Sequence, residues 1–384
     1  MSHAKEYDYI IAGAGCAGLS LAMYIIHSGG FSHKKILLVD KDAKNANDRT
    51  WCFWEKDAGL FEPIVHQQWN KLWVHEHNAS KKLDIHPYYY KMIRGIDFYD
   101  YCFHQINQQP NFTFLQQKVE HVFSSQDTTG IMVAGKPIHA DYVFNSILFR
   151  QPELDNKEYW LLQHFKGWII ETEENVFNEN EATLMDFRTN QKDGTAFCYV
   201  LPLAANKALV EYTLFSPQLL QPKEYNDGLA SYICNILHIN AYKIIDEEFG
   251  VIPMTNAPFE PSVNHIINMG TAGGQTKASS GYTFQFIQKQ AQAIVANLIK
   301  NGEPSYAFEK SRFHFYDSVL LNILYKKKYP GSKIFYRLFA ANNTSTVFNF
   351  LDNQSSLQQE LRIIGSLPTL PFLKAALHQL NPFV

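Results

Sequence analysis

Tyr7 to Gly18 reads YDYIIAGAGCAG, in which an apolar run leads into three glycines spaced as G-x-G-x-x-G. The run predicts a buried parallel strand, and the apolar residues that follow as far as His27 predict a helix. The segment KKILLVD, which ends at Asp40, predicts a second strand. A strand, a glycine turn, a helix and a strand within about 35 residues are typical of a βαβ unit that binds a dinucleotide.

Each glycine of this turn has its own task. Gly13 permits the tight turn, Gly15 lets the backbone approach a pyrophosphate, and Gly18 lets the helix and strand pack closely. Free N–H groups at the start of the helix, together with the helix dipole, attract phosphate. Asp40 follows at the end of the second strand, where it is placed to accept hydrogen bonds from the adenosine ribose. The motif alone does not distinguish FAD from NAD.

A second glycine-rich segment, far along the chain, favours FAD. Residues 266–286 read IINMGTAGGQTKASSGYTFQF and repeat the order strand, glycine turn and helix. The extended FAD molecule needs a second contact, which Gly270, Gly273 and Gly281 are expected to supply. The helix that begins near Gly281 is expected to direct its positive dipole end at the flavin ring, where it favours the anionic reduced form. Tyr282 is a further candidate to face the flavin.

Composition argues against several other classes of protein. The 384 residues, 46% hydrophobic and 18% charged, allow two domains or one large composite domain. A net charge of −3 gives no sign of nucleic-acid binding. The five scattered cysteines contain no C-x-x-C pair, which favours a reducing compartment over a disulfide framework. His75 and His77 lack a third ligand, so no metal site is expected.

Two further patterns concern the surroundings of the protein. The polar start of the chain is unlike a signal peptide, and no run of 18 or more apolar residues predicts a transmembrane helix. Residues 319–339, VLLNILYKKKYPGSKIFYRLF, combine apolar and basic residues. This pattern fits either a peripheral contact with an anionic membrane or a helix pair that closes the core and exposes its lysines.

Several motifs appear in order along nearly the whole chain, and together they resemble the bacterial lycopene β-cyclase family. The glycine-rich segment 266–286 is one of them. The others are DRTWCFW (48–54), Gln163 with Phe165 and Gly167-Trp168, MDF (185–187), LPL (201–203), LVEYT (209–213), GVIPM (250–254), FYD (315–317) and FNFLD (348–352).

The resemblance implies an α/β fold similar to the aromatic-hydroxylase flavoproteins. Such a fold has a Rossmann-like FAD-binding domain, a β-sheet substrate domain and a helical C-terminal region. We expect the FAD-binding domain to be discontinuous. The implied boundaries are 1–60, 95–150 and 250–300 for the FAD-binding domain, 61–94 and 151–249 for the substrate domain, and 301–384 for the helical region.

The implied activity is the redox-neutral cyclisation of lycopene. An isomerase (intramolecular lyase) of this kind closes the acyclic ψ-ends of lycopene into β-ionone rings, giving γ-carotene and then β-carotene. The FAD must be in its reduced form, and NADPH or NADH is the implied electron donor. Because the substrate resides in membranes, we expect a cytoplasmic protein that lies on the inner face of the cell membrane.

Glu211 is the residue that the resemblance implies as catalytic. It lies in ALVEYT, a predicted strand that pairs with residues 196–201 and forms the floor of the substrate site. Many members of the family have a second acid directly after it, whereas this chain has Tyr212. Glu211 is either the general acid, with a pKa raised by an apolar pocket, or an ionised group that stabilises the cation while the reduced flavin handles the proton. Arg49 is expected to contact FAD or to order its loop.

Two other functions fit parts of the pattern. A flavin-dependent monooxygenase of the aromatic-hydroxylase type would share the fold and both glycine motifs. A non-enzymatic carrier of prenyl lipids on a flavoprotein scaffold would share the fold without turnover.

Overall fold

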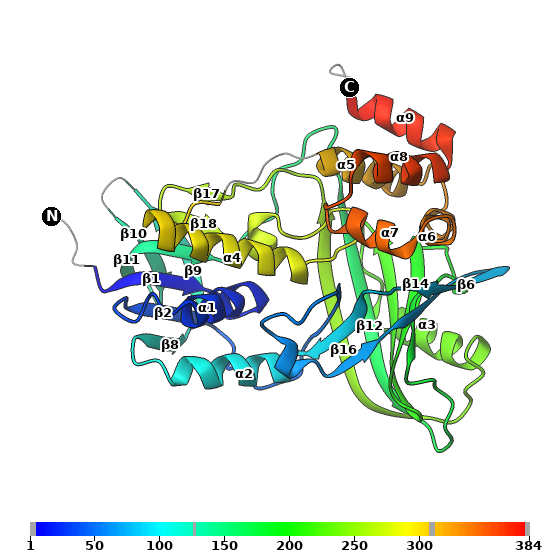
Figure 1. Cartoon of the computed structure of the whole chain (residues 1–384), viewed down its shortest axis with the longest axis horizontal. Coiled ribbons are helices and arrows are strands. Elements are labelled where there is room, and N and C mark those ends of the chain that lie inside the picture. The colour runs from blue at the N-terminus through cyan, green and yellow to red at the C-terminus, as the bar shows by residue number, and fades with distance from the viewer. Residues whose placement is uncertain (1–4, 126–127, 307–311, 381–384) are drawn as a thin grey trace.

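The computed structural model describes residues 5–125, 128–306 and 312–380, and Figure 1 shows two large sheets side by side with helices around them. The first sheet has the order β17-β18-β11-β1-β2-β8, and the hairpin β9–β10 extends from β11. β1 pairs in parallel with both β2 and β11. The strands are β1 (Tyr7–Ala12), β2 (Ile36–Asp40), β8 (Phe112–Gln116), β9 (Val119–Ser124), β10 (Thr129–Val133), β11 (Lys136–Asn145), β17 (Ser262–Val263) and β18 (Ile266–Asn268).

β1 is buried on both faces, which explains its unbroken apolar sequence. Tyr9 and Ile11 pack with helices α1 (Cys16–Ser28), α2 (Gly95–Asn107) and α4 (Phe284–Asn301). Ile10 and Ala12 point to the opposite face, where residues of β9 and β10 cover them. The structure therefore confirms the predicted strand, glycine turn, helix and strand.

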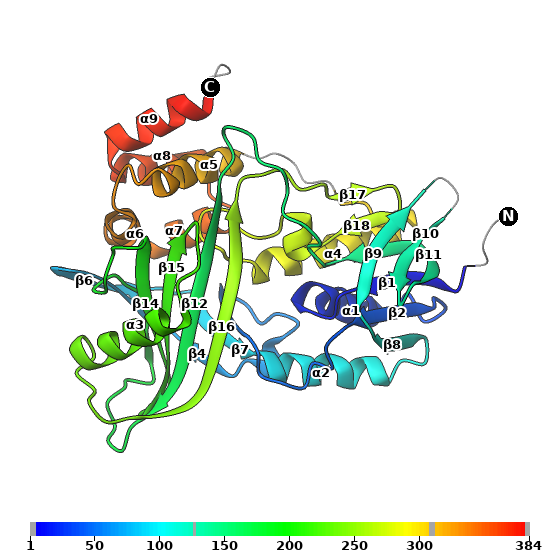
Figure 2. The same cartoon turned by 180° about the vertical axis from the view of Figure 1, so that it is seen from behind.

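The second sheet has the order β16-β12-β15-β14-β13-β5-β6, and it is antiparallel except between β13 and β5. Its longest strands lie together at one edge. Helix α3 (Pro222–Asn235) packs against β12 and β15, as the view from behind shows (Figure 2). The strands are β5 (Lys71–Glu76), β6 (Ala79–Asp84), β12 (Trp160–Glu171), β13 (Glu181–Asp186), β14 (Thr195–Ala204), β15 (Lys207–Ser216) and β16 (Lys243–Thr255).

Glu211 and Tyr212 are adjacent in β15 and point to opposite faces of the sheet. Leu209 and Phe215 share the face of Glu211 and belong to the core that continues into the C-terminal helices. Tyr212 points to the other face, where it is buried against α3. A Cβ on Gly228 of α3 would come within 2.7 Å of the Tyr212 ring. An acid at position 212 would therefore face away from Glu211. The tyrosine in this chain thus takes no carboxyl group away from the face on which Glu211 lies.

A third, smaller sheet has the order β3-β7-β4. It consists of β3 (Thr50–Glu55), β4 (Gln67–Trp69) and β7 (Tyr89–Arg94), with the short helix η1 (Glu62–Ile64) before β4. β3 packs against α4, so this sheet links the regions of the two large sheets.

The C-terminal part is helical, as predicted. Its helices are α5 (Arg312–Tyr325), α6 (Gly331–Ala340), α7 (Thr344–Leu351), α8 (Leu357–Ser366) and α9 (Thr369–Leu380). Val319, Leu321, Ile323 and Phe335 are buried in the core, so the apolar residues of 319–339 close the interior. Of the two readings of this segment, the structure supports the core-closing helix pair. In the part of the chain that the structure describes, no helix is long and apolar enough to cross a membrane.

Candidate active site

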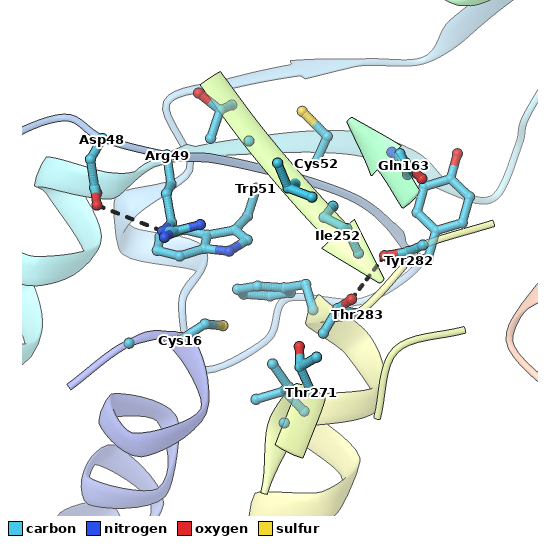
Figure 3. A pocket seen from close by; sticks show the side chains of 18 of the residues that line it. Cys16, Asp48, Arg49, Trp51, Cys52, Gln163, Ile252, Thr271, Tyr282 and Thr283 are labelled. Atoms are coloured by element: carbon cyan, nitrogen blue, oxygen red, sulfur yellow. Dashed lines mark hydrogen bonds and ion pairs between the residues drawn. The ribbon is translucent and has the colours of Figure 1, made fainter. Parts of the chain in front are cut away.

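One cavity of about 410 Å³ connects the first glycine turn with β15. Figure 3 shows Arg49 and Trp51 toward one side of this space and Gln163 and Tyr282 toward the other. The cavity contains most of the residues that the sequence predicted for the site. Those lining it are Gly13, Gly15, Asp40, Arg49, Gly270, Gly281 and Glu211.

The first glycine turn has the geometry that a phosphate requires. Gly13 has φ +99°, which disfavours any side chain. A Cβ on Gly18 would lie 1.9 Å from the carbonyl oxygen of Gly13, so Gly18 supports the turn from beneath and does not line the cavity. A Cβ on Gly15 would meet no atom within 4 Å. Helix α1 has no side-chain cap, which leaves its first N–H groups available to a ligand.

Asp40 is almost buried and anchors the same turn. Its Oδ2 accepts a hydrogen bond of 2.7 Å from the N–H of Ala14, and its Oδ1 accepts one from Asp42. Lys44 Nζ lies 3.4 Å from Oδ2, while Arg49 pairs with Asp48 at 3.6 Å (Figure 3). Lys44 and Arg49 both line the cavity and bring positive charge to it.

The second glycine segment follows β18 and also borders the cavity, through Gly270 and Gly281. Gly281 has φ +72°, and a Cβ there would lie 2.2 Å from Gln163 Oε1 on β12. That oxygen is buried and has no hydrogen-bond partner among the described residues. A bound ligand with an N–H donor would satisfy it, as the chemistry of a flavin ring allows. Gly273 lies outside this cavity and lines a second one of about 260 Å³.

Glu211 lies at the end of the cavity that is lined by apolar and aromatic side chains. Thr213 Oγ1 donates a hydrogen bond of 2.6 Å to Glu211 Oε1. Burial first, and the negative charge of Glu248 second, raise the pKa of Glu211 well above its ordinary value. The side chains that line this end include Tyr90, Tyr199, Leu201, Leu209 and Tyr282. Burial and the neighbouring charge therefore both disfavour ionisation of this carboxyl group.

Glu248 on β16 is a polar group that the sequence analysis missed. Thr50 Oγ1 donates a hydrogen bond of 2.7 Å to Glu248 Oε2. Glu248 Oε1 is buried without a hydrogen-bond partner in the described parts of the chain. The signal in the sequence is the acidic run Asp246–Glu248, which only Phe249 separates from GVIPM.

The sequence profile described as "Lycopene cyclase protein" matches residues 8–377 of this chain. The chain belongs to the lycopene cyclase family. A relative of this family member is the chloroplastic neoxanthin synthase of Solanum tuberosum, which is 24% identical over 315 residues. The alignment covers 77% of this chain and 61% of the relative, so the chain spans about three fifths of that protein's length.

Solved structures agree on the fold of this lycopene cyclase family member. A geranylgeranyl bacteriochlorophyll reductase-like protein from Thermoplasma acidophilum superposes with a TM-score of 0.62 at 12% identity, covering 97% of this chain and 99% of that one. The p-nitrophenol 4-monooxygenase of Pseudomonas putida gives 0.60 at 12% identity with the same coverage. The fold is therefore the Rossmann-like flavoprotein fold that the sequence predicted.

The two tryptophans of the motif DRTWCFW make structural contacts. Trp51 lines the cavity and packs on Phe98, with ring centres 4.9 Å apart. Trp54 lies outside it, stacks on Phe348 and donates a hydrogen bond of 2.8 Å to Asp352. The predicted His75–His77 pair gains no third ligand, and the structure contains no metal-binding cluster among its described residues.

Proposed function

We propose that this member of the lycopene cyclase family is a lycopene β-cyclase that works without net redox change. The observation that carries the proposal is that the partly buried acid Glu211 shares one cavity with the glycine turn after β1. A dinucleotide at Gly13 and Gly15 would extend toward Glu211, so cofactor and acid would act on one substrate end.

The residues present fit FAD as the dinucleotide. We assign Gly13, Gly15, Lys44 and Arg49 to the pyrophosphate and Asp40 to the ribose. We assign Gly270, Gly281 and Gln163 to the flavin end, which makes the sheet around β1 the core of the FAD-binding domain. When bound, reduced FAD supplies an electron-rich ring that stabilises positive charge beside it. NADPH or NADH is the electron donor in this proposal.

Glu211 then acts as the general acid. Its proton goes to C2 of the terminal C1=C2 bond, which leaves a tertiary cation at C1. The electrons of C5=C6 form the C1–C6 bond, and loss of the proton on C6 restores a C5=C6 double bond in the closed ring. Tyr90, Tyr199 and Tyr282 surround the acid and exclude water, which would otherwise trap the cation as an alcohol.

The substrate reaches the protein from a membrane in this proposal, through the surface of α8 and α9. Leucines recur there at helical spacing and are exposed by 62% at Leu370, 59% at Leu377 and 66% at Leu380. The companion residues of this leucine surface are Leu357, Leu361, Ile364 and Leu373. Lys326 Nζ lies 3.1 Å from His378 Nε2 of α9, so the basic run 326–328 adjoins the leucine surface. Exposed leucines beside lysines fit an anionic lipid surface, here the inner face of the cell membrane.

An anaerobic reaction tests the proposal. The protein is loaded with FAD, reduced with dithionite and then given lycopene. The products are separated, and their masses are determined by mass spectrometry. We expect cyclised carotenoids of unchanged mass. Unchanged lycopene beside reduced flavin would refute the cyclase assignment. A product that gains oxygen, and appears only with O₂ and NADPH, would instead identify a monooxygenase.

A further inference from the structure

Glu211 and Glu248 lie at the same level of the sheet, on either side of β12. Gly167 of β12 pairs with Glu211 of β15 and also with Glu248 of β16. Residues paired across neighbouring strands direct their side chains to the same face of a sheet. The two glutamates therefore stand on one face, and the residue between them has no side chain.

The missing side chain of Gly167 leaves space for the two carboxyl groups to approach each other. A Cβ at this position would lie 3.0 Å from Glu248 Cγ and 3.3 Å from Glu248 Oε1. The side chain of Glu248 thus extends over Gly167, and its unpaired oxygen lies on the side of β12 where Glu211 stands. Any larger residue at position 167 would fill the space that the carboxyl group occupies.

The hydrogen bonds around the pair lack one donor. Thr213 donates a hydrogen bond to Glu211 Oε1, and Thr50 donates one to Glu248 Oε2. The buried Glu248 Oε1 has no partner among the described residues. Two ionised carboxylates offer only acceptors to each other. A single proton on Glu211 makes that group a donor and gives Glu248 Oε1 the partner it lacks.

We propose that Glu211 and Glu248 form a dyad that shares one proton, in which Glu248 is the positioning residue that keeps the proton on Glu211 and orients it. The inference rests on the proposed function for its role in cyclisation. Burial raises the pKa of both groups, but the charge of Glu248 adds to the effect at Glu211. At Glu248 the hydrogen bond from Thr50 opposes it. Because Glu248 Oε1 lacks a donor, the dyad places its proton on Glu211.

The dyad also accounts for the proton that leaves. Once Glu211 has given its proton to C2, the pair carries two negative charges at close range. Like charges make such a pair a stronger base than one carboxylate, so it accepts the proton that leaves C6 as the ring double bond forms. One proton leaves the dyad and one returns, and no oxidant or reductant is consumed.

Other ionisable groups face the dyad from several elements. Arg49 and Asp246 act on Glu248 in opposite directions, the first lowering its pKa and the second raising it. The remaining neighbours are neutral at ordinary pH because burial raises their pKa values. They are Cys52 of β3, Tyr90 of β7, Tyr199 of β14 and Tyr282 before α4. A titration between weakly acidic and weakly alkaline pH therefore measures the protonation of Glu211 and Glu248.

Infrared difference spectra test the dyad without lycopene. Flavin-loaded wild type is compared with Glu211→Gln over a range of pH, and the band of a protonated carboxylic acid that the variant lacks is followed. In Glu248→Gln this band should disappear at lower pH than in wild type, because the anion that raises the pKa of Glu211 is gone. Glu247→Gln is the matched control, since Glu247 is half exposed and pairs with Lys166.

Turnover gives a second readout. We expect Glu248→Gln to lower kcat by about tenfold or more, within the range of general acid effects, with KM for lycopene and FAD affinity unchanged. The alkaline limb of its pH profile should move to lower pH, and Glu248→Asp should move it back toward wild type. If Glu248→Gln does not fold, Gly167→Ala is the alternative variant. It keeps both carboxyl groups but moves them apart, so the alkaline limb of its pH profile should also move to lower pH.

The outcomes separate the two proposals. A wild-type protein that shows the band and its Glu248-dependent shift but leaves lycopene unchanged would retain the dyad and refute the proposed function. Cyclisation with an identical titration in wild type and Glu248→Gln would refute the dyad and retain the cyclase. Absence of a protonated Glu211 band at neutral pH would also refute the shared proton.

Discussion

Gly167 leaves open the space that the side chain of Glu248 fills, since a Cβ at 167 would lie 3.0 Å from Glu248 Cγ. Glycine within a strand usually weakens it, because it packs no side chain and loses more entropy on folding. The long strand β12 nevertheless carries glycine beside the two partly buried acids. In this chain the side chain of Glu248, and not the strand itself, gives a reason for glycine at position 167.

The first prediction is that Gly167→Ala lowers activity and stability together. The added methyl group must displace Glu248 or Leu209, whose Cδ1 would lie 2.9 Å from it. Overpacking of this kind costs about 1–3 kcal/mol of unfolding free energy. We expect turnover to fall by about tenfold or more, as measured by product analysis beside chemical denaturation. Gly365→Ala in α8 is the control, because nothing lies within 4 Å of its Cβ position.

A second prediction concerns Glu211→Gln. Without the acid, cyclisation should fall by about 10²–10⁴-fold while FAD still binds. The pKa of Glu211 is raised above its ordinary value of 4.5, so its contribution to stability is complete below that pH and is lost as the pH rises through the folded-state pKa. The variant should therefore melt at higher temperature than wild type at pH 8, and the advantage should vanish near pH 4. Equal melting curves at pH 8, or wild-type turnover, would contradict this role for Glu211.

The sequence predicted those parts of the site that depend on local patterns. An apolar run, three glycines and a terminal acid define the turn at Gly13 without reference to the rest of the chain. Glu211 was implied by the resemblance of its motif LVEYT, a short stretch of one strand, to the family. Glu248 was missed because only the pairing of β12 with both β15 and β16 places it beside Glu211. The acidic run Asp246–Glu248 is visible in the sequence, but the register that brings Glu248 beside Glu211 is not.

Burial was likewise harder to predict than helix formation. The segment 319–339 has the amphipathic pattern of both a surface helix and a core helix, and the structure buries its apolar side. The exposed leucines occur instead on α8 and α9, where the same spacing faces outward. Which helix faces inward depends on the packing of all five helices and not on the pattern of one. The assignment of domain boundaries stays a prediction.

A third prediction separates cofactor binding from folding. A Cβ at Gly15 would meet no atom within 4 Å, so Gly15→Ala should fold and melt like wild type. The methyl group would nevertheless project into the cavity that we assign to the pyrophosphate. We expect FAD affinity to fall by about tenfold or more in a fluorescence titration. Gly30→Ala, in the loop after α1, should bind FAD as wild type does. Unchanged affinity in Gly15→Ala would mean that the phosphates do not approach this turn.

The last prediction concerns the leucine surface of α8 and α9. Replacing Leu370, Leu373 and Leu377 with serine should reduce binding to vesicles that contain phosphatidylglycerol by at least about tenfold, since a fully buried leucine contributes about 1.5–3 kcal/mol. Leu219→Ser, an exposed leucine before α3, should bind as wild type does. Turnover of lycopene in detergent should be unaffected in both, because none of these residues lines the cavity.

The basic run beside that surface gives the electrostatic half of the same prediction. Glutamine at Lys326, Lys327 and Lys328 should weaken binding to anionic vesicles by about 1 kcal/mol for each charge and remove most of its salt dependence. Binding to neutral phosphatidylcholine vesicles should change little, because the leucines remain. Sedimentation with vesicles of both compositions measures the two contributions separately. If the serine variant binds anionic vesicles like wild type, lycopene reaches the cavity by another surface of the protein.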